Sequence, residues 1–326
     1  MTSGLLLIDK PQGWTSHDAV ARTRRLAGTR KVGHAGTLDP MATGLLILGV
    51  DSSTRLLTYV VGLDKEYLAT IRLGAATTTD DAEGEQLSRA PAEAVAALPP
   101  GAIAAGIAAL TGDISQRPSA VSAIKVDGKR AYARVRAGED VELPARPVTV
   151  SAFELLSGTP VDGFLDLEVR VACSSGTYIR ALARDLGAAL GVGGHLTSLR
   201  RTRIGPFTLD AAQPLEELDV PSALIDPADA ATRLLGRLDL TEAQAIDLGH
   251  GKRIVVDPAA SRPGPIAAIA PDGRLVGLVE YRGGQAKSLL NFPPDEASAP
   301  SKVPTGAPTE APTTPPPAAP GATDAP

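Results

Sequence analysis

Apolar and polar positions along the chain follow two periods, and each period predicts a different kind of element. Near-regular alternation runs through 65–73 and 165–173, which is typical of strands with one buried face. Continuous apolar runs at 5–8 and 44–50 suit short buried strands. A stripe at helical spacing follows the second alternating strand and predicts an amphipathic helix. Its members are Ile179, Leu182, Ala183, Leu186 and Leu190.

Capping residues, prolines and glycines predict where other elements begin and end. Ser16 is predicted to cap a helix that ends near Gly28. The alanine-rich stretch 92–110 is interrupted by Pro99-Pro100-Gly101, so we expect two short helices there. The acidic segment 80–84 is predicted to be a solvated loop.

The pattern changes near residue 236 to short apolar segments, of which 266–270 and 275–281 flank a hairpin-like Pro-Asp-Gly turn. We therefore predict an α+β protein with a large domain over 1–235, a small β-rich domain over 236–292 and a tail over 293–326. The tail holds eleven of the 28 prolines and no aromatic residue, leucine or isoleucine. Such a composition does not bury enough apolar surface to fold, and it suits a solvated tail or a Pro-rich docking segment.

The charge of separate segments is more informative than the net charge of the chain. The formal net charge is −5, and the tail, with four acidic residues and one lysine, supplies more than half of it. Residues 10–36 hold six basic side chains and only Asp18 as an acid, while 180–203 hold five arginines and only Asp185. These clusters fit either a groove for a polyanion or two solvated helix faces.

Several classes of site have no support in the sequence. A single cysteine, Cys173, excludes an internal disulfide and falls on the apolar face of its strand. The four histidines, His17, His34, His195 and His250, lack metal-ligand spacing. No run approaches the length of a membrane span, and no signal peptide is recognisable. We expect a cytoplasmic protein without metal or cofactor.

The stretch 31–44 concentrates the most unusual residues of the chain. Three glycines permit backbone angles closed to other residues, and Pro40 restrains Asp39 to an extended conformation. The Asp39 carboxylate would thus lie on a constrained turn at the mouth of the buried strand 44–50. The alternative is an ordinary turn in which Asp39 bonds its own backbone.

Two further residues allow a structural and a functional interpretation. Tyr67 begins the apolar face of its strand, where core packing is the simpler account. Arg180 lies near the start of a helix predicted to be capped by Ser174 or Ser175, where the helix dipole disfavours a cation. We expect an anionic partner for Arg180, either in a site or in a surface ion pair.

The segment 33–44, Gly-His-Ala-Gly-Thr-Leu-Asp-Pro-Met-Ala-Thr-Gly, closely resembles the signature of the TruB family of tRNA pseudouridine synthases around its catalytic aspartate. The resemblance continues through 5–13, 65–67, 117–125, 173–180 and 199–201. It implies the pseudouridine synthase fold, a mixed and largely antiparallel sheet flanked by helices, with an RNA cleft across one face. The small C-terminal domain loosely resembles a PUA-like RNA-binding module.

The resemblance also implies an activity: conversion of uridine 55 in the T loop of tRNA to pseudouridine, without a guide RNA, on a base flipped out of the loop. It assigns catalysis to Asp39, Arg180 and Tyr67, where Asp39 attacks C6 or C1′ or acts as a base, Arg180 pairs with it and Tyr67 stacks on the uracil. The substrate-binding residues implied are His34, Tyr178, Leu199, Lys10, Gly36 and Arg200.

Two other functions remain compatible with these motifs: a guide-RNA-dependent pseudouridine synthase, and an RNA-binding or tRNA-folding module in which catalysis is secondary. The partner expected in the main interpretation is the T arm of tRNA, bound mostly through phosphates and shape. We expect a monomer with no protein partner and no membrane contact.

The tail generates the first testable prediction. A chain that ends at Phe292 should keep the melting temperature and the activity of the full chain, because 293–326 lacks residues that pack. Thermal unfolding and an isomerisation assay on both chains check this. A clear loss of either property would show that the tail docks on the body or on RNA.

Overall fold

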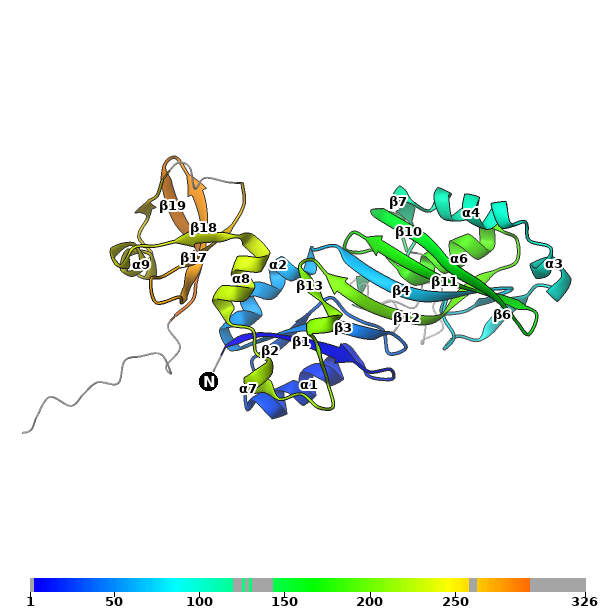
Figure 1. Ribbon diagram of the computed structural model, residues 1–326, viewed down its shortest axis with the longest axis horizontal. Helices are drawn as coiled ribbons and strands as arrows, with labels where there is room; N and C mark the ends of the chain where they lie inside the picture. Colours follow the sequence, from blue (N-terminus) through cyan, green and yellow to red (C-terminus); the bar gives the residue numbers. More distant parts are fainter. Residues whose placement is uncertain (1–2, 120–124, 127–128, 131–142, 258–262, 294–326) are drawn as a thin grey trace, which may run out of the picture.

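The computed structural model describes residues 3–119, 125–126, 129–130, 143–257 and 263–293 (Figure 1). Most of the predicted tail, 294–326, therefore lies outside the described residues. Within them the chain forms one large sheet with flanking helices, a second sheet near the C-terminus and two small hairpins. The predicted α+β class is confirmed.

The large sheet has ten strands, eight of them in the order β14-β1-β3-β12-β4-β11-β10-β7, with β2 and β13 pairing to β3 and β12. Only the β1–β14 and β3–β12 pairs are parallel, so the sheet is mixed and largely antiparallel, as expected. Its strands are β1 (Gly4–Lys10), β2 (Val32–Ala35), β3 (Thr43–Val50), β4 (Lys65–Leu73), β7 (Gly112–Gln116), β10 (Arg146–Val161), β11 (Phe164–Cys173), β12 (Gly194–Ile204), β13 (Phe207–Thr208) and β14 (Gln213–Pro214).

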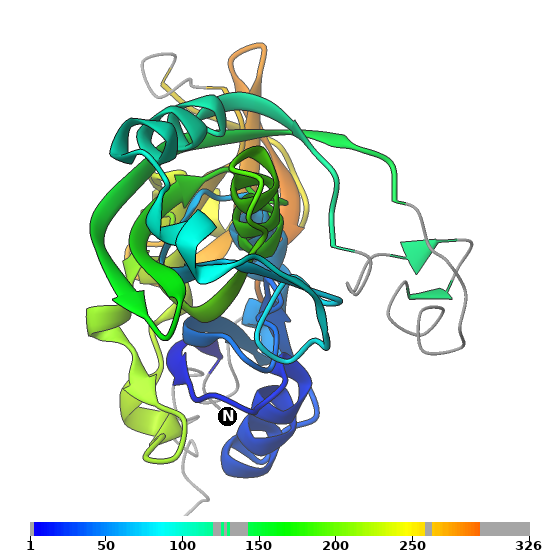
Figure 2. The ribbon, with the colours of Figure 1, turned by 90° about the vertical axis from the view of Figure 1, so that its right-hand side faces the viewer.

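Both faces of the sheet are covered. One face packs on α1 (Ser16–Ala27), α4 (Pro100–Ala109) and α6 (Ile179–Ala189), and Figure 2 shows α6 within the curve of β10 and β11. The apolar face of β4, from Tyr67 to Leu73, joins this core. Successive residues of β1 divide between the two sides, with Leu6 and Ile8 in this core and Leu5 and Leu7 in the opposite one. This division explains why β1 reads as a continuous apolar run.

The opposite core joins the large sheet to the C-terminal one. Its members include α2 (Leu57–Val61), α8 (Pro227–Leu235) and apolar residues of the second sheet such as Ile269 and Leu278. That sheet has the order β15-β17-β18-β19-β16, and α8 lies between the two sheets in Figure 1. Its elements are β15 (Arg237–Asp239), α9 (Glu242–Gly249), β16 (Ile254–Val255), β17 (Ile266–Ile269), β18 (Leu275–Arg282) and β19 (Gln285–Asn291). The predicted hairpin is the β17–β18 pair, while the domain boundaries stay predictions.

The remaining elements are short. The interrupted helix is confirmed as α3 (Ala92–Ala96) followed by α4. The others are η1 (Asp51–Leu56), β5 (Ala75–Thr77), β6 (Gln86–Arg89), β8 (Lys125–Val126), β9 (Lys129–Arg130), η2 (Leu209–Ala211) and α7 (Val220–Ala223).

The predicted N-caps of two helices were wrong by a few positions, while the first of these helices ends at Gly28 as predicted. Thr15, not Ser16, caps α1 in a capping box with Asp18. Tyr178 occupies the N-cap of α6 with no side-chain cap bond, so neither Ser174 nor Ser175 caps that helix. Ser16 is instead buried inside the first turn, where its hydroxyl contacts the backbone of Leu38.

The start of β3 needs a glycine. Gly44 has φ +97°, and a Cβ there would lie 2.8 Å from the backbone nitrogen of Arg201 and closer still to its carbonyl oxygen. The parallel pairing of β3 with β12 occurs at this point, through Gly44 opposite Arg201. Any side chain at position 44 would push the two strands apart.

We therefore predict that Gly44→Ala lowers the free energy of unfolding by at least about 1–3 kcal/mol, the range for a residue forced into a strained backbone conformation. Urea unfolding measures this. Gly62→Ala is the matched control, because Gly62 has φ −77° and nothing within 4 Å of the added methyl. Equal stability of the two variants would contradict the close approach of β3 and β12.

Candidate active site

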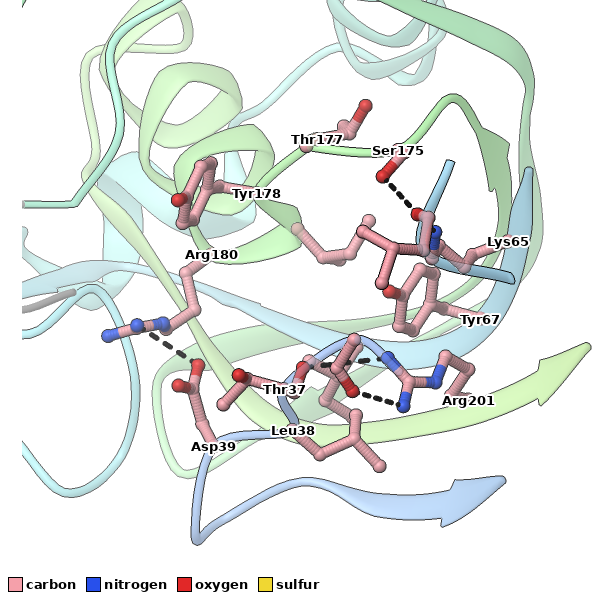
Figure 3. Close-up of a pocket in the computed structure, with 15 residues that line it drawn as sticks. Thr37, Leu38, Asp39, Lys65, Tyr67, Ser175, Thr177, Tyr178, Arg180 and Arg201 are labelled. Carbon is pink, nitrogen blue, oxygen red and sulfur yellow. Dashed lines mark hydrogen bonds and ion pairs between the residues drawn. The ribbon is translucent and has the colours of Figure 1, made fainter. Parts of the chain in front are cut away.

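A cavity of about 310 Å³ opens between the loop after β2, the start of α6 and strands β4 and β12 (Figure 3). Six of the nine predicted site residues line this cavity. They are Gly36, Asp39, Tyr67, Tyr178, Arg180 and Leu199. Residues separated by as many as 163 positions thus meet in one place.

The loop that carries Asp39 is held through its backbone. Val32–Ala35 proves to be strand β2, so within the stretch 31–44 only residues 36–42 form a loop between strands. Ser16 Oγ accepts a hydrogen bond from Leu38 N at 2.9 Å and donates one to Leu38 O at 3.2 Å. Gly13 N donates to Pro40 O at 2.8 Å. These bonds fix the loop on both sides of Asp39, whose side chain remains 38% exposed to the cavity.

Arg180 bridges two carboxylates. Its Nη2 lies 3.0 Å from Asp39 Oδ2, and its Nη1 lies 3.3 Å from Asp81 Oδ2 and donates to Thr79 O at 2.9 Å. The residue is 5% exposed, so the surface ion pair considered from the sequence is excluded. Two anions at the start of α6 offset the unfavourable position of this cation in the helix dipole.

Asp81 was missed by sequence reasoning. The predicted solvated loop at 80–84 is wrong at this residue, because Asp81 is only 3% exposed. Its Oδ1 accepts hydrogen bonds from Thr79 Oγ1 at 2.5 Å and from Glu83 N at 3.1 Å. Buried charges need such partners. The only signal in the sequence was that Arg180 required an anion, and any acidic residue could have met that requirement.

Tyr67 and Leu199 form the inner wall of the cavity. They lie on the paired strands β4 and β12, where Tyr67 is opposite Arg201 and Leu199 is opposite Ala69. Both side chains are buried. Burial raises the pKa of the Tyr67 hydroxyl, and the Arg201 cation acts in the opposite direction. This wall presents one aromatic ring and one aliphatic side chain.

Arg201 has a place in the wall that its position in a basic cluster did not predict. Its Nε donates to Leu45 O at 2.8 Å, and its Nη2 donates to Gly36 O at 3.0 Å, which ties β12 to the loop before Asp39 (Figure 3). Among the described residues it makes no ion pair with a carboxylate. Lys65 also lines the cavity, and burial, with the Arg201 cation, lowers the pKa of its amine to about 8.

Tyr178 stands at the outer edge, two residues before Arg180. Both residues line the cavity from the start of α6, and their side chains extend to the same side in Figure 3. Burial raises the pKa of the Tyr178 hydroxyl, and the Arg146 cation acts against this rise.

Three predicted substrate-binding residues lie outside the cavity lining. His34 lies in β2 with its ring edge-on to that of His17 at 5.5 Å between centroids. Arg200 pairs with Asp9 at 2.6 Å and is partly exposed. Lys10 is fully buried, and its Nζ donates to Pro11 O at 2.8 Å and Trp14 O at 2.7 Å. That burial argues against a direct phosphate contact and makes Lys10 an internal support for the segment before α1.

The chemistry available to the cavity is that of a carboxylate among cations. In the part of the chain that the structure describes, no group of three or more histidine, cysteine or acidic residues could hold a metal ion. Asp39 is a potential nucleophile or base, Arg180 orients it, and Arg201 and Lys65 add positive charge to the wall.

The Arg180 bridge makes a prediction about stability. Arg180→Met should lower the free energy of unfolding by about 3–5 kcal/mol, because it leaves the buried Asp81 carboxylate without its cation. Adding Asp81→Asn to that variant should recover part of the loss, since the uncompensated charge disappears. Urea unfolding of both single variants and the double variant tests this. Losses that simply add in the double variant would show that Asp81 and Arg180 are not coupled.

Family models match the chain from residue 24 to residue 293. Residues 24–179 match the model of the TruB family pseudouridylate synthase N-terminal domain, 180–238 match a tRNA pseudouridylate synthase B C-terminal domain, and 235–293 match a tRNA pseudouridine synthase II C-terminal model. In the described residues, no helix combines the length and apolarity of a membrane span.

The chain also matches named relatives over nearly the whole length of those proteins. The tRNA pseudouridine synthase B of Leifsonia xyli is 68% identical over 90% of this chain and 98% of its own. That of Arthrobacter sp. is 58% identical over 90% of this chain and 98% of its own. A chain of a Cbf5-Nop10-Gar1 complex shares the fold with TM-score 0.66 and 25% identity over 89% of this chain and 85% of its own. The chain therefore belongs to the TruB family of pseudouridine synthases.

Proposed function

We propose that this protein converts uridine 55 in the T loop of tRNA to pseudouridine without a guide RNA and without a cofactor. The observation that carries the proposal is the Asp39 carboxylate, exposed in a cavity of about 310 Å³ and held 3.0 Å from the Arg180 guanidinium. The name shared by relatives at 68% and 58% identity supports the same substrate.

The reaction requires few chemical groups besides the Asp39 carboxylate and the Arg180 guanidinium. The N1–C1′ bond of uridine breaks, the uracil turns, a C5–C1′ bond forms, C5 loses a proton and N1 gains one. No electron is gained or lost overall, so the step needs no redox partner. A carboxylate can attack the substrate covalently or take the proton, and Asp39 is the acidic side chain that lines the cavity.

The cavity walls suit a single pyrimidine. A base in the folded T loop is inaccessible, so it has to be flipped out to reach Asp39. Tyr67 offers a ring for stacking, and Leu199 offers an apolar contact on the same wall. Arg180, Arg201 and Lys65 make the surroundings cationic, which favours a polyanionic strand at the entrance.

Other parts of the chain have roles in the same proposal. The second sheet is a PUA-like RNA-binding module, and exposed arginines such as Arg25 and Arg30 contact backbone phosphates. The protein works as a monomer in the cytoplasm, where its tRNA substrate is found.

A guide-dependent reaction is the competing function, because the same sequence motifs also allow it. The experiment that separates the two uses purified protein and one tRNA transcript labelled with tritium at uridine C5. Tritium release without any guide RNA or added protein supports the proposal. A transcript with cytidine at position 55 is the control and should release none. Release that depends on a guide RNA, or no release at all, would overturn the proposal.

The role of Asp39 yields a mutational prediction. Asp39→Asn should abolish tritium release and leave the dissociation constant for tRNA within about tenfold, or about 1.4 kcal/mol, because the amide keeps the shape of the loop and removes the nucleophile. Filter binding and single-turnover assays measure the two quantities. Near-wild-type turnover in the purified variant would rule out Asp39 as the reacting group.

A further inference from the structure

Gln116, at the end of β7, is bonded to the backbone of Tyr178 through both ends of its side-chain amide. Its Nε2 donates to Tyr178 O at 3.0 Å, and its Oε1 accepts from Tyr178 N at 2.8 Å. The residue is 2% exposed. The amide therefore pairs with Tyr178 as the backbone of a neighbouring strand would, with one donor and one acceptor in one plane.

Tyr178 needs such a partner because of where it lies. It is the N-cap of α6, in extended backbone at φ −104° and ψ 108°, and no side chain caps the helix there. The first backbone N–H groups of a helix lack partners within the helix. The Gln116 amide supplies an acceptor for Tyr178 N and fixes the residue from which the ring and, two positions later, the Arg180 guanidinium enter the cavity.

Gln116 is itself firmly placed. Its backbone pairs with Arg146 in the β7–β10 register. The segment that follows it is fastened beside α6 and the acidic turn, because Arg184 Nη2 donates to Arg117 O at 2.8 Å and Ser119 Oγ donates to Asp80 Oδ2 at 2.5 Å. Because these bonds hold the backbone at Gln116, its side-chain amide restrains the backbone of Tyr178.

We infer that Gln116 is a positioning residue of the reaction, which holds Tyr178 so that its ring and hydroxyl stay at the cavity wall beside Asp39. The inference rests on the proposed function. It assigns a role in the active site to a residue that neither lines the cavity nor carries charge. Loss of the amide frees the start of α6, and the Tyr178 ring then samples several orientations.

Gln116→Met tests the inference, since methionine keeps the length of the side chain and removes both hydrogen bonds. The matched control is Gln213→Met, because the Gln213 amide also accepts from the backbone of a helix N-cap, Asp219 N at 3.3 Å before α7, and Gln213 lies outside the cavity and the second sheet. We expect the single-turnover rate of Gln116→Met at saturating enzyme to fall at least about tenfold, or about 1.4 kcal/mol, with tRNA affinity within about threefold. Gln213→Met should leave both quantities at the wild-type level.

A second measurement on the RNA-free protein reports position without activity. In protein labelled with ¹³Cζ-tyrosine, the Tyr178 signal is assigned by its absence from Tyr178→Phe. Gln116→Met should shift or broaden the Tyr178 signal and leave the Tyr67 signal unchanged, and Gln213→Met should change neither.

The outcomes separate the two proposals. Absence of tritium release from the wild-type protein would remove the proposed function. With the wild-type protein active, a near-wild-type rate in Gln116→Met would overturn the inference. An unchanged Tyr178 signal in a slow Gln116→Met variant would also overturn it, since the loss would not run through Tyr178. A slow rate with a changed Tyr178 signal and an inert control would establish the positioning role.

Discussion

The buried Arg180 guanidinium, held between Asp39 and Asp81, is the interaction on which the site depends. A cation at the start of a helix and largely removed from water is unfavourable alone, and two carboxylates on separate loops compensate for it. The arrangement joins the start of α6, the loop before β3 and the acidic turn after β5. One of the two anions, Asp81, is buried, and the other, Asp39, faces the cavity, so the same arginine joins an internal carboxylate to an accessible one.

Around this centre, polar side chains that bond to backbone hold the loops in place. Ser16 bonds both backbone groups of Leu38, and Gln116 bonds both backbone groups of Tyr178. Arg201 donates to Gly36 O from the strand beside β3. Each of these contacts acts on a residue within three positions of Asp39 or Arg180. Loops fixed in this way can present an exposed carboxylate without the entropy of a mobile segment.

Strand pairing in the large sheet brings the residues of the cavity wall together. Its parallel β3–β12 pair brings Arg201 beside Gly44, and the antiparallel β12–β4 pair brings Leu199 and Tyr67 to one face. Cores on both sides fix the strands that carry these residues. The cavity thus lies where the sheet and the start of a helix meet, and loop residues such as Asp39 complete its lining.

The sequence by itself determined several elements and singled out the loop that carries Asp39, because these depend on local periodicity and on residues with restricted backbone angles. Strands 65–73 and 165–173, the stripe of α6 and the helix break at Pro99 are all present. It also indicated that Arg180 requires an anion. Only the tertiary structure decided which anions serve Arg180, that Lys10 is buried, that Arg201 lines the cavity and that Gln116 bonds to Tyr178. Apart from the burial of Lys10, those facts depend on contacts between residues 62 to 165 positions apart, such as Gln116 with Tyr178 and Arg201 with Gly36, and no local pattern encodes such pairings.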